Sequence, residues 1–258
     1  MPPMQHLNRI NHQGLPAISG LTLPVIDPAT GETFAHLARS DARDIDLAVQ
    51  GARACFEGPW ARLDATERGR LLMALSRRII ERGDELAAIE QRDCGKPVSQ
   101  AKADVVALSR YFEFYAGACD KLHGDTLPFR NGYTALTWRE PHGVTGHVIP
   151  WNYPMQIFGR SVGGALAAGN VCVVKPAEDA CLSLLKVSEL MALPRRCGSP
   201  SWRPRWASRL AAFKSSRVWG MRRVKRCANT RASITSVSRA APASAHWCNN
   251  WLQLTTAR

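Results

Sequence analysis

The stretch that most constrains the fold is residues 144–178, in which two short apolar runs flank a helical segment. Residues 144–149 suit a buried strand, and the β-branched run at 171–174 suits a second one. Between them, residues 155–168 alternate bulky and small side chains as a packed helix does. A strand, a helix and a strand within about 30 residues have the spacing of a parallel βαβ unit. The sequence therefore predicts an α/β fold centred on this unit.

Polar side chains follow both predicted strands. Trp151 and Asn152 come after the first strand, and Lys175 and Glu178 come at the end of the second. In open parallel sheets, ligands bind beyond the carboxyl ends of the strands. The pattern therefore predicts that these groups gather where a nucleotide would lie. Two plainer interpretations remain open: Asn152 could only cap the following helix, and Lys175 and Glu178 could be a solvated turn.

The two motifs also carry a family resemblance. The run Ile-Pro-Trp-Asn-Tyr-Pro at 149–154, followed by Lys-Pro-Ala-Glu at 175–178, resembles the aldehyde dehydrogenase superfamily. The resemblance implies that Asn152 donates its side-chain amide to the oxyanion of the reaction intermediate. It places Ile149, Pro150 and Trp151 at the nicotinamide end of the cofactor.

The resemblance also implies that Lys175 and Glu178 hold the adenosine ribose. NAD or NADP is then the expected cofactor. NAD is favoured, because the carboxylate of Glu178 would repel a 2′-phosphate, and its binding by the truncated chain is expected to be impaired.

The resemblance extends over residues 21–193, which we interpret as part of a cofactor-binding domain preceded by an extended arm at 1–20. Asp-Pro and Thr-Gly turn signals predict a hairpin at 25–32. Asp41 predicts the start of one helix, and Asp64 or Thr66 that of the next. Further helices are expected around 86–90 and 99–118, and a strand at 133–140. We expect a fold of helices followed by an incomplete Rossmann-like parallel sheet, in which the 133–140 strand serves in oligomerisation.

Several side chains in these elements have plain structural interpretations. The helix at 99–118 carries Ala103, Val106, Tyr111 and Tyr115 at its apolar positions, and its charged residues are interpreted as a solvated face. Gly163 and Gly164 are expected to allow close packing of a helix on the sheet. His142 and His147 are expected to be ordinary turn and strand residues.

The eight cysteines are scattered without Cys-x-x-Cys spacing, which argues against a zinc site and a disulfide framework. Cys94 is the most tempting nucleophile, because the nearby Lys96 would lower its pKa. Its helical context, however, predicts a place away from the strand ends, so a structural role is favoured. Cys172 is expected to be a packing residue in a core strand.

The net charge of +13 comes from the last quarter of the chain. Residues 194–258 hold 14 Lys and Arg, five Trp and no acidic residue, and the preceding residues are nearly neutral. A disordered basic tail is one interpretation, but five tryptophans suit disorder poorly. A tail that binds nucleic acid through phosphate contacts and stacking is another.

The genetic code favours a third interpretation. Trp is encoded only by TGG, so the codons of His-Trp-Cys-Asn-Asn-Trp-Leu at 246–252, read one base earlier, give Leu, Val, Gln or stop, Gln or stop, Leu, and Ala or Val. The same shift at 213–220 permits Gln-Val-Val-x-Gly-Leu-Gly. Both products resemble the family at the corresponding places. We therefore expect a frameshift near residues 193–202, in the gene or in its sequencing, which resequencing would test.

The length of the chain limits which function can be expected of it. A complete aldehyde dehydrogenase is about twice this long, so the resemblance implies that the N-terminal half is present and that the catalytic Cys and general-base Glu are absent. The expected function is NAD(P)-dependent aldehyde oxidation in the intact family and an inactive, truncated chain here. A non-catalytic partner of an intact paralogue is the main alternative. No secretory signal or membrane helix is apparent, so a cytoplasmic location is expected.

Overall fold

The predicted βαβ unit is present in the computed structural model, which describes residues 4–11 and 13–191. Strand β8 (Val144–Ile149) and strand β9 (Val171–Pro176) pair in parallel and are connected by helix α5 (Pro154–Ala167). The register sets Val148 opposite Lys175 and Ile149 opposite Pro176. The two segments that follow these strands therefore leave the same edge of the sheet. The tail at 194–258, with its expected change of frame, lies outside the described residues.

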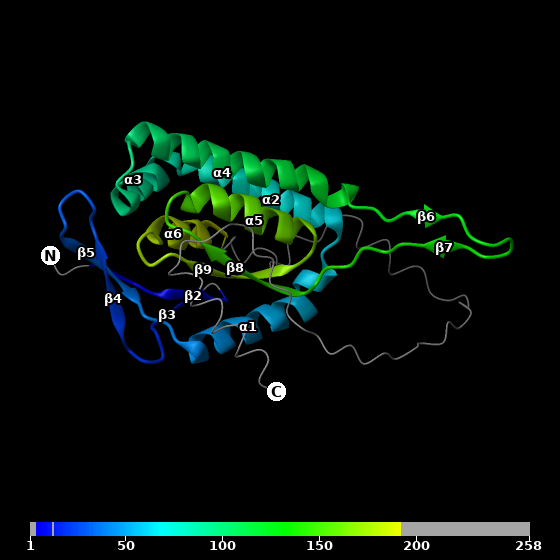
Figure 1. The fold of residues 1–258 in the computed structure, drawn as a ribbon, viewed down its shortest axis with the longest axis horizontal. Helices are drawn as coiled ribbons and strands as arrows, with labels where there is room; N and C mark the ends of the chain where they lie inside the picture. The colour runs from blue at the N-terminus through cyan, green and yellow to red at the C-terminus, as the bar shows by residue number, and fades with distance from the viewer. Residues whose placement is uncertain (1–3, 12, 192–258) are drawn as a thin grey trace, which may run out of the picture.

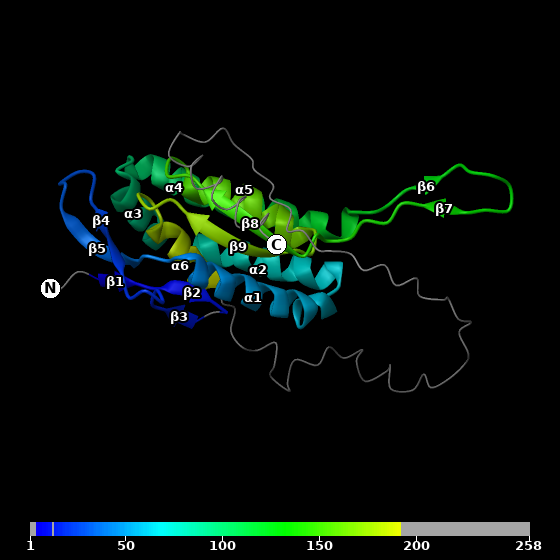
Figure 2. The ribbon, with the colours of Figure 1, turned by 60° about the horizontal axis from the view of Figure 1, so that its bottom comes forward.

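Helices cover both faces of the β8–β9 pair. Helix α1 lies on one side and α5 on the other, and α4 and α2 pack beyond α5 (Figures 1 and 2). Helix α3 runs into α4 and contacts α6, the last described element. The bounds are α1 (Ala42–Glu57), α2 (Ala65–Glu81), α3 (Gly83–Cys94), α4 (Val98–Ala118) and α6 (Leu182–Met191), with short 3-10 turns at Trp60–Arg62 and Cys119–Lys121. The described part is thus a mixed α/β fold, as the sequence predicts.

Two of the helices begin at capping boxes. The backbone amide of Glu67 donates to the Asp64 side chain over 2.7 Å, and the amide of Asp64 donates to the Glu67 carboxylate over 3.0 Å. Asp41 caps α1 in the same way, with Asp44 as its reciprocal partner. Each box satisfies backbone donors that a helix start leaves free. Of the two candidate caps for α2, the structure selects Asp64.

The N-terminal residues form small sheets. The predicted hairpin consists of β4 (Thr22–Ile26) and β5 (Thr33–Ala38), closed by a hydrogen bond from the Gly31 amide to the Asp27 carbonyl. Strand β1 (Met4–His6) adds to β5 in parallel, and β2 (Asn8–Ile10) pairs with β3 (Gln13–Leu15). The described part of the expected arm at 1–20 is therefore extended but paired. The sequence gives little sign of this, because the strands are only three residues long.

The segment between α4 and β8 projects away from the body as a long arm, seen in Figures 1 and 2. Its paired part is shorter than predicted: β7 covers Ala135–Leu136 and pairs with β6 (Thr126–Leu127). Because this hairpin covers no core of its own, little apolar burial is available to extend the ladder.

The main core lies between α2, α4 and α5. Phe112 of α4 is fully buried and packs against Phe158 of α5, with ring centroids 6.1 Å apart. The buried face of α4 differs from the predicted one. Val106 is 53% exposed and Ala103 is also exposed, so two of the predicted apolar positions face away from the core. The residues buried on this helix are Ala101, Asp104, Val105, Leu108, Ser109, Phe112 and Ala116. Burial of Asp104 contradicts the solvated-face interpretation for that residue, whereas Lys102 and Arg110 are exposed as expected.

Gly163 and Gly164 allow α5 to approach α4 closely. The sequence predicts a close approach of this helix to the sheet instead. A Cβ atom at Gly163 would lie 2.7 Å from Cδ2 of Tyr115, and one at Gly164 would lie 3.2 Å from the same ring. Tyr115 belongs to α4, so the small residues belong to the α4–α5 contact. The sequence shows that a close approach is needed but not which neighbour requires it.

We expect Gly163→Ala to lower the free energy of unfolding by about 1–3 kcal/mol, the usual effect of overpacking a close contact. Gly117→Ala on α4 is the matched control, since nothing lies within 4 Å of its added Cβ. That control should raise stability by up to about 1 kcal/mol, because alanine favours the helix. Urea unfolding of both variants measures the difference. Equal effects of the two substitutions would contradict the packing described here.

Within the described ranges, no helix combines the length and apolar character needed to cross a lipid bilayer.

Candidate functional site

The carboxyl edge of the β8–β9 pair gathers the predicted site residues. Trp151 is 57% exposed, and Asn152 is also exposed. Lys175 and Glu178 follow from β9, and their side chains form an ion pair with Nζ and Oε1 3.4 Å apart. The parallel register brings both segments to one edge, as the sequence predicts. The arrangement offers a cation, a carboxylate, an amide and an indole to a ligand.

Two of the predicted cofactor contacts are less accessible. Ile149 is 1% exposed and belongs to the main core, and Pro150 is half-buried. Neither side chain could offer a polar contact to a cofactor. A contact of either residue with a cofactor would have to come from its backbone or from apolar packing, and their place at the cofactor stays a prediction.

Asn152 does not cap the helix that follows it. The N-cap of α5 is Tyr153, and the described start of this helix has no side-chain cap hydrogen bond. Pro154 occupies the first turn, where its missing amide hydrogen costs little. The capping interpretation of Asn152 is therefore wrong, and its carboxamide is exposed at the sheet edge.

A buried ionic cluster lies directly behind this loop, and sequence reasoning missed it. The ammonium of Lys96 donates to Oδ2 of Asp104 over 2.7 Å and to Oε1 of Glu90 over 3.0 Å. Both carboxylates are fully buried. Burial raises the pKa of Glu90 even though Lys96 opposes this effect. Burial alone would lower the pKa of Lys96, but its two carboxylate partners raise it overall. Lys96 is therefore held as a cation.

Cys94 lies nearer to the site than the sequence suggested. Its Sγ is 3.7 Å from the carbonyl oxygen of Trp151, so the expectation that it lies away from the strand ends is wrong. Burial, reinforced by the charge of Glu90, raises the pKa of the Cys94 thiol to about 12. Lys96 does lower this pKa, but its effect is smaller. Cys94 is therefore close to the predicted site, but its thiol stays protonated and cannot be an effective nucleophile at neutral pH.

The other cysteines near the sheet are no better nucleophiles. Cys172 lies in β9, where burial raises its pKa to about 12. Burial also raises the pKa of Cys181 above its usual range. The packing role predicted for Cys172 agrees with its place beside the main core.

His147 is an ordinary strand residue in position, as predicted, and is buried within β8. Its Nε2 is 2.9 Å from Oγ1 of Thr145, and its Nδ1 is 2.6 Å from Oγ of Ser161. Burial lowers its pKa, so the ring is neutral at physiological pH. Both ring nitrogens are thus occupied by hydroxyl groups and unavailable as a general base. His142 lies on the exposed turn before β8.

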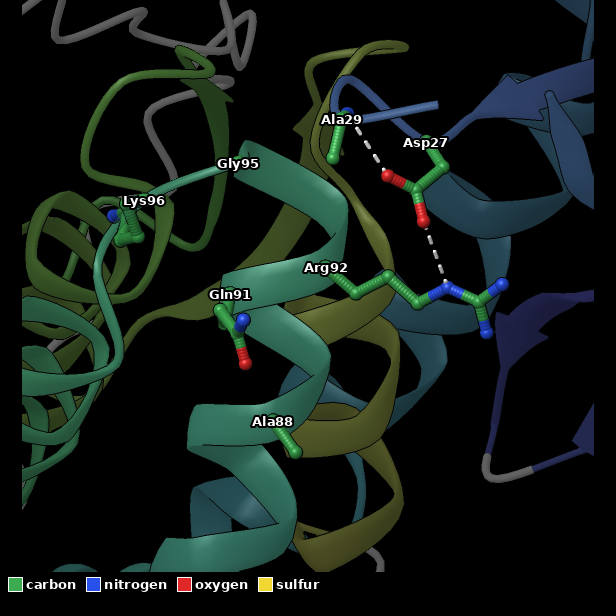
Figure 3. A pocket seen from close by; sticks show the side chains of 7 residues that line it. All are labelled: Asp27, Ala29, Ala88, Gln91, Arg92, Gly95 and Lys96. Atoms are coloured by element: carbon green, nitrogen blue, oxygen red, sulfur yellow. Dashed lines mark hydrogen bonds and ion pairs between the residues drawn. The ribbon is translucent and has the colours of Figure 1, made fainter. Parts of the chain in front are cut away.

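A shallow hollow lies beside the end of α3 and is lined in part by Lys96 (Figure 3). Arg92 crosses it, donates to Asp27 over 3.1 Å and covers the ring of Phe34 at 4.2 Å. Gly95, in a left-handed conformation, ends the helix where the hairpin turn packs against it. Much of the hollow is therefore formed where the hairpin packs on α3 through Asp27, Arg92 and Gly95, and Lys96 of the buried cluster borders it.

Comparison with known proteins gives a consistent family. Residues 17–200 match the model of the aldehyde dehydrogenase family. Over 190 residues the chain is 44% identical to hydroxyisobutyraldehyde dehydrogenase of Mycolicibacterium austroafricanum, covering 74% of this chain and 37% of that protein. It is 45% identical over 183 residues to the mitochondrial benzaldehyde dehydrogenase of Antirrhinum majus, covering 70% of this chain and 34% of the relative.

Solved structures agree with this match. A structure from Burkholderia cenocepacia is 63% identical, with a TM-score of 0.71 over 73% of this chain and 39% of that one. An NAD+ complex of an aldehyde dehydrogenase from Bacillus cereus is 39% identical, with a TM-score of 0.70 over 73% and 38%. The chain thus spans somewhat more than a third of the length of these relatives.

Proposed function

Because the chain belongs to the aldehyde dehydrogenase family, we propose that its edge at β8 and β9 is the dinucleotide-binding part of an aldehyde-oxidising site. The observation that carries this proposal is the common edge of Asn152, Lys175 and Glu178, set by the parallel register. The ion pair between Lys175 and Glu178 offers a donor and an acceptor beside each other, which is what the hydroxyls of a ribose require. The exposed indole of Trp151 offers a flat apolar surface at the other end.

Each residue has a proposed role in that site. Lys175 and Glu178 hold the adenosine ribose, and the carboxylate of Glu178 favours NAD over NADP. The Asn152 amide donates to the oxygen on which negative charge develops when a nucleophile adds to the aldehyde. A nicotinamide held at this edge would supply the hydride acceptor that aldehyde oxidation needs in the intact family. Asn152 is suited to its role because its amide is not used to cap α5.

We also propose that this chain, as its sequence stands, does not oxidise aldehydes. The reaction requires a thiolate and a general base. Burial raises the pKa of Cys94 and of Cys172 to about 12, so neither supplies the thiolate. The family match stops at residue 200, close to the proposed frameshift at 193–202. The sequence beyond it is the basic tail, whose alternative frame resembles the family.

The arm formed by β6 and β7 supports a further part of the proposal, assembly with a second copy or with an intact paralogue. It exposes the aromatic side chains of Phe129, Tyr133 and Trp138, which are 67%, 72% and 82% accessible. Exposed aromatic groups on a projecting hairpin are suited to burial against another chain. Co-purification with a full-length family member would distinguish the non-catalytic partner from a chain that acts alone.

Titration of NAD+ into the purified chain, followed by isothermal calorimetry, tests the cofactor-binding proposal. We expect saturable binding of NAD+, weakened about tenfold or more by Lys175→Ala because one charge-assisted contact is lost. Lys102→Ala, which removes an exposed lysine of α4, is the control and should leave binding unchanged. Absence of saturable binding, or equal loss in both variants, would contradict the assignment of the edge.

A further inference from the structure

Lys96 joins the buried ionic cluster to the loop that carries Asn152. Besides Glu90 and Asp104, its ammonium donates to the backbone carbonyl of Asn152 over 3.3 Å. The same ammonium lies 5.1 Å from the centre of the Tyr153 ring. One buried cation therefore contacts two consecutive residues of the exposed loop.

The other contacts of the cluster lead to the same loop. Gln156, in the first turn of α5, donates to Oδ1 of Asp104 over 2.7 Å. Gln100 of α4 donates to the same oxygen over 2.8 Å. Asp104 thus accepts from α4 and α5 as well as from Lys96. The loop between β8 and α5 is tied to the cluster at its middle by Lys96 and at its far end by Gln156.

The ionic cluster that holds the exposed loop is itself almost entirely shielded from solvent. The side chains of Glu90 and Asp104 are 0% exposed and that of Lys96 is 11% exposed. Burying three charges costs desolvation, so such a cluster is weak grounds for inferring stability by itself. Its main effect is to fix positions. Charge-assisted hydrogen bonds that are short and shielded from water hold each group of the cluster in one place.

We propose that Lys96, held by Glu90 and Asp104, is a positioning residue that sets the Trp151–Asn152–Tyr153 backbone, and through it the Asn152 amide, at the nicotinamide end of the site. This inference rests on the proposed function for the importance of Asn152. The holding of the loop itself is independent of any cofactor. The contacts of the Lys96 ammonium with the site go to Asn152 and Tyr153, so we expect its effect at the nicotinamide end.

Two variants test the inference. Lys96→Met removes the ammonium and keeps a side chain of similar length, but it leaves two buried carboxylates. The triple variant Glu90→Gln, Lys96→Met, Asp104→Asn removes the ammonium without leaving a buried charge, and it retains the shapes of its neighbours. Lys102→Met is the control, since this lysine of α4 is 60% exposed and pairs with exposed Asp84.

The first measurement is hydrogen exchange, without cofactor, of the Ile157 amide, which donates to the carbonyl of Tyr153 over 3.0 Å. We expect exchange about tenfold faster in Lys96→Met and in the triple variant, the effect of losing one charge-assisted hydrogen bond. Amides of β8 and of the control variant should keep their rates. Wild-type exchange at the Ile157 amide in the folded triple variant would overturn the inference.

The second measurement compares NAD+ with AMP, which lacks the nicotinamide end. We expect both Lys96 variants to weaken NAD+ about tenfold and to leave AMP unchanged. Equal weakening of both ligands would mean a general structural role and would also overturn the inference. If the wild-type chain binds neither ligand, the proposed function fails, and the exchange rates alone decide whether Lys96 holds the loop.

Discussion

Asp104→Ala is expected to lower the free energy of unfolding by about 3–5 kcal/mol, the usual result of removing one partner from a buried ion pair. Asp104 accepts hydrogen bonds from Lys96, Gln100 and Gln156 and is fully buried. Its removal leaves the Lys96 ammonium with Glu90 as its remaining carboxylate partner and leaves the side-chain amides of Gln100 and Gln156 without this acceptor. Urea unfolding monitored by circular dichroism gives the change.

Asp120→Ala is the matched control for this prediction. Asp120 lies just beyond the end of α4 and forms its ion pair with Lys121 in an exposed position, with both side chains at least half accessible. This substitution should leave the unfolding midpoint unchanged, because exposed pairs contribute little. If Asp104→Ala lowered the free energy of unfolding no more than the control does, the buried cluster would not stabilise the contact between α3, α4 and α5 as described.

Glu178→Gln is expected to reduce the preference for NAD+ over NADP+ by about tenfold, equivalent to about 1.4 kcal/mol. The carboxylate accepts from a free 2′-hydroxyl but repels a 2′-phosphate, and the amide does not repel it. Stability should change little, since the Glu178 side chain is 60% exposed. Titration of both dinucleotides into the variant measures the preference.

Asp179→Asn makes the same change of charge one residue further along and serves as the control. Asp179 is also exposed. It should keep the wild-type preference if the effect belongs to Glu178 and not to the general charge of the turn. An unchanged preference in Glu178→Gln would remove Glu178 from the proposed ribose contacts.

Features with local causes could be predicted from the sequence. The capping boxes at Asp41 and Asp64 depend on residues three positions apart, and the hairpin turn at 27–32 depends on its own Pro and Gly. The βαβ unit could be predicted for a similar reason, because its periods and its length lie in one continuous stretch. Once β8 and β9 are known to be parallel, the common edge of Asn152, Lys175 and Glu178 follows.

Features with distant partners could not be predicted in this way. Asp104 is charged and lies on a long helix, so a solvated face is the ordinary expectation, and only Lys96 and Gln156, from other elements, make its burial possible. The approach of Cys94 to Trp151 depends on how α3 ends against the loop after β8. The sequence did hold one signal of the buried cluster. Glu90 and Asp104 lie on the two helices joined by the Gly-Lys-Pro turn at 95–97, so both acids could reach Lys96.

We propose that this chain holds the dinucleotide edge and the oxyanion donor of an aldehyde dehydrogenase without a working nucleophile. The most direct test is an assay of NADH formation with the chain, NAD+ and a short aliphatic aldehyde, at chain concentrations high enough to detect one turnover. We predict no NADH from the chain and none from Asn152→Ala. NADH that increases with the amount of chain and is lost in Asn152→Ala would contradict the claim.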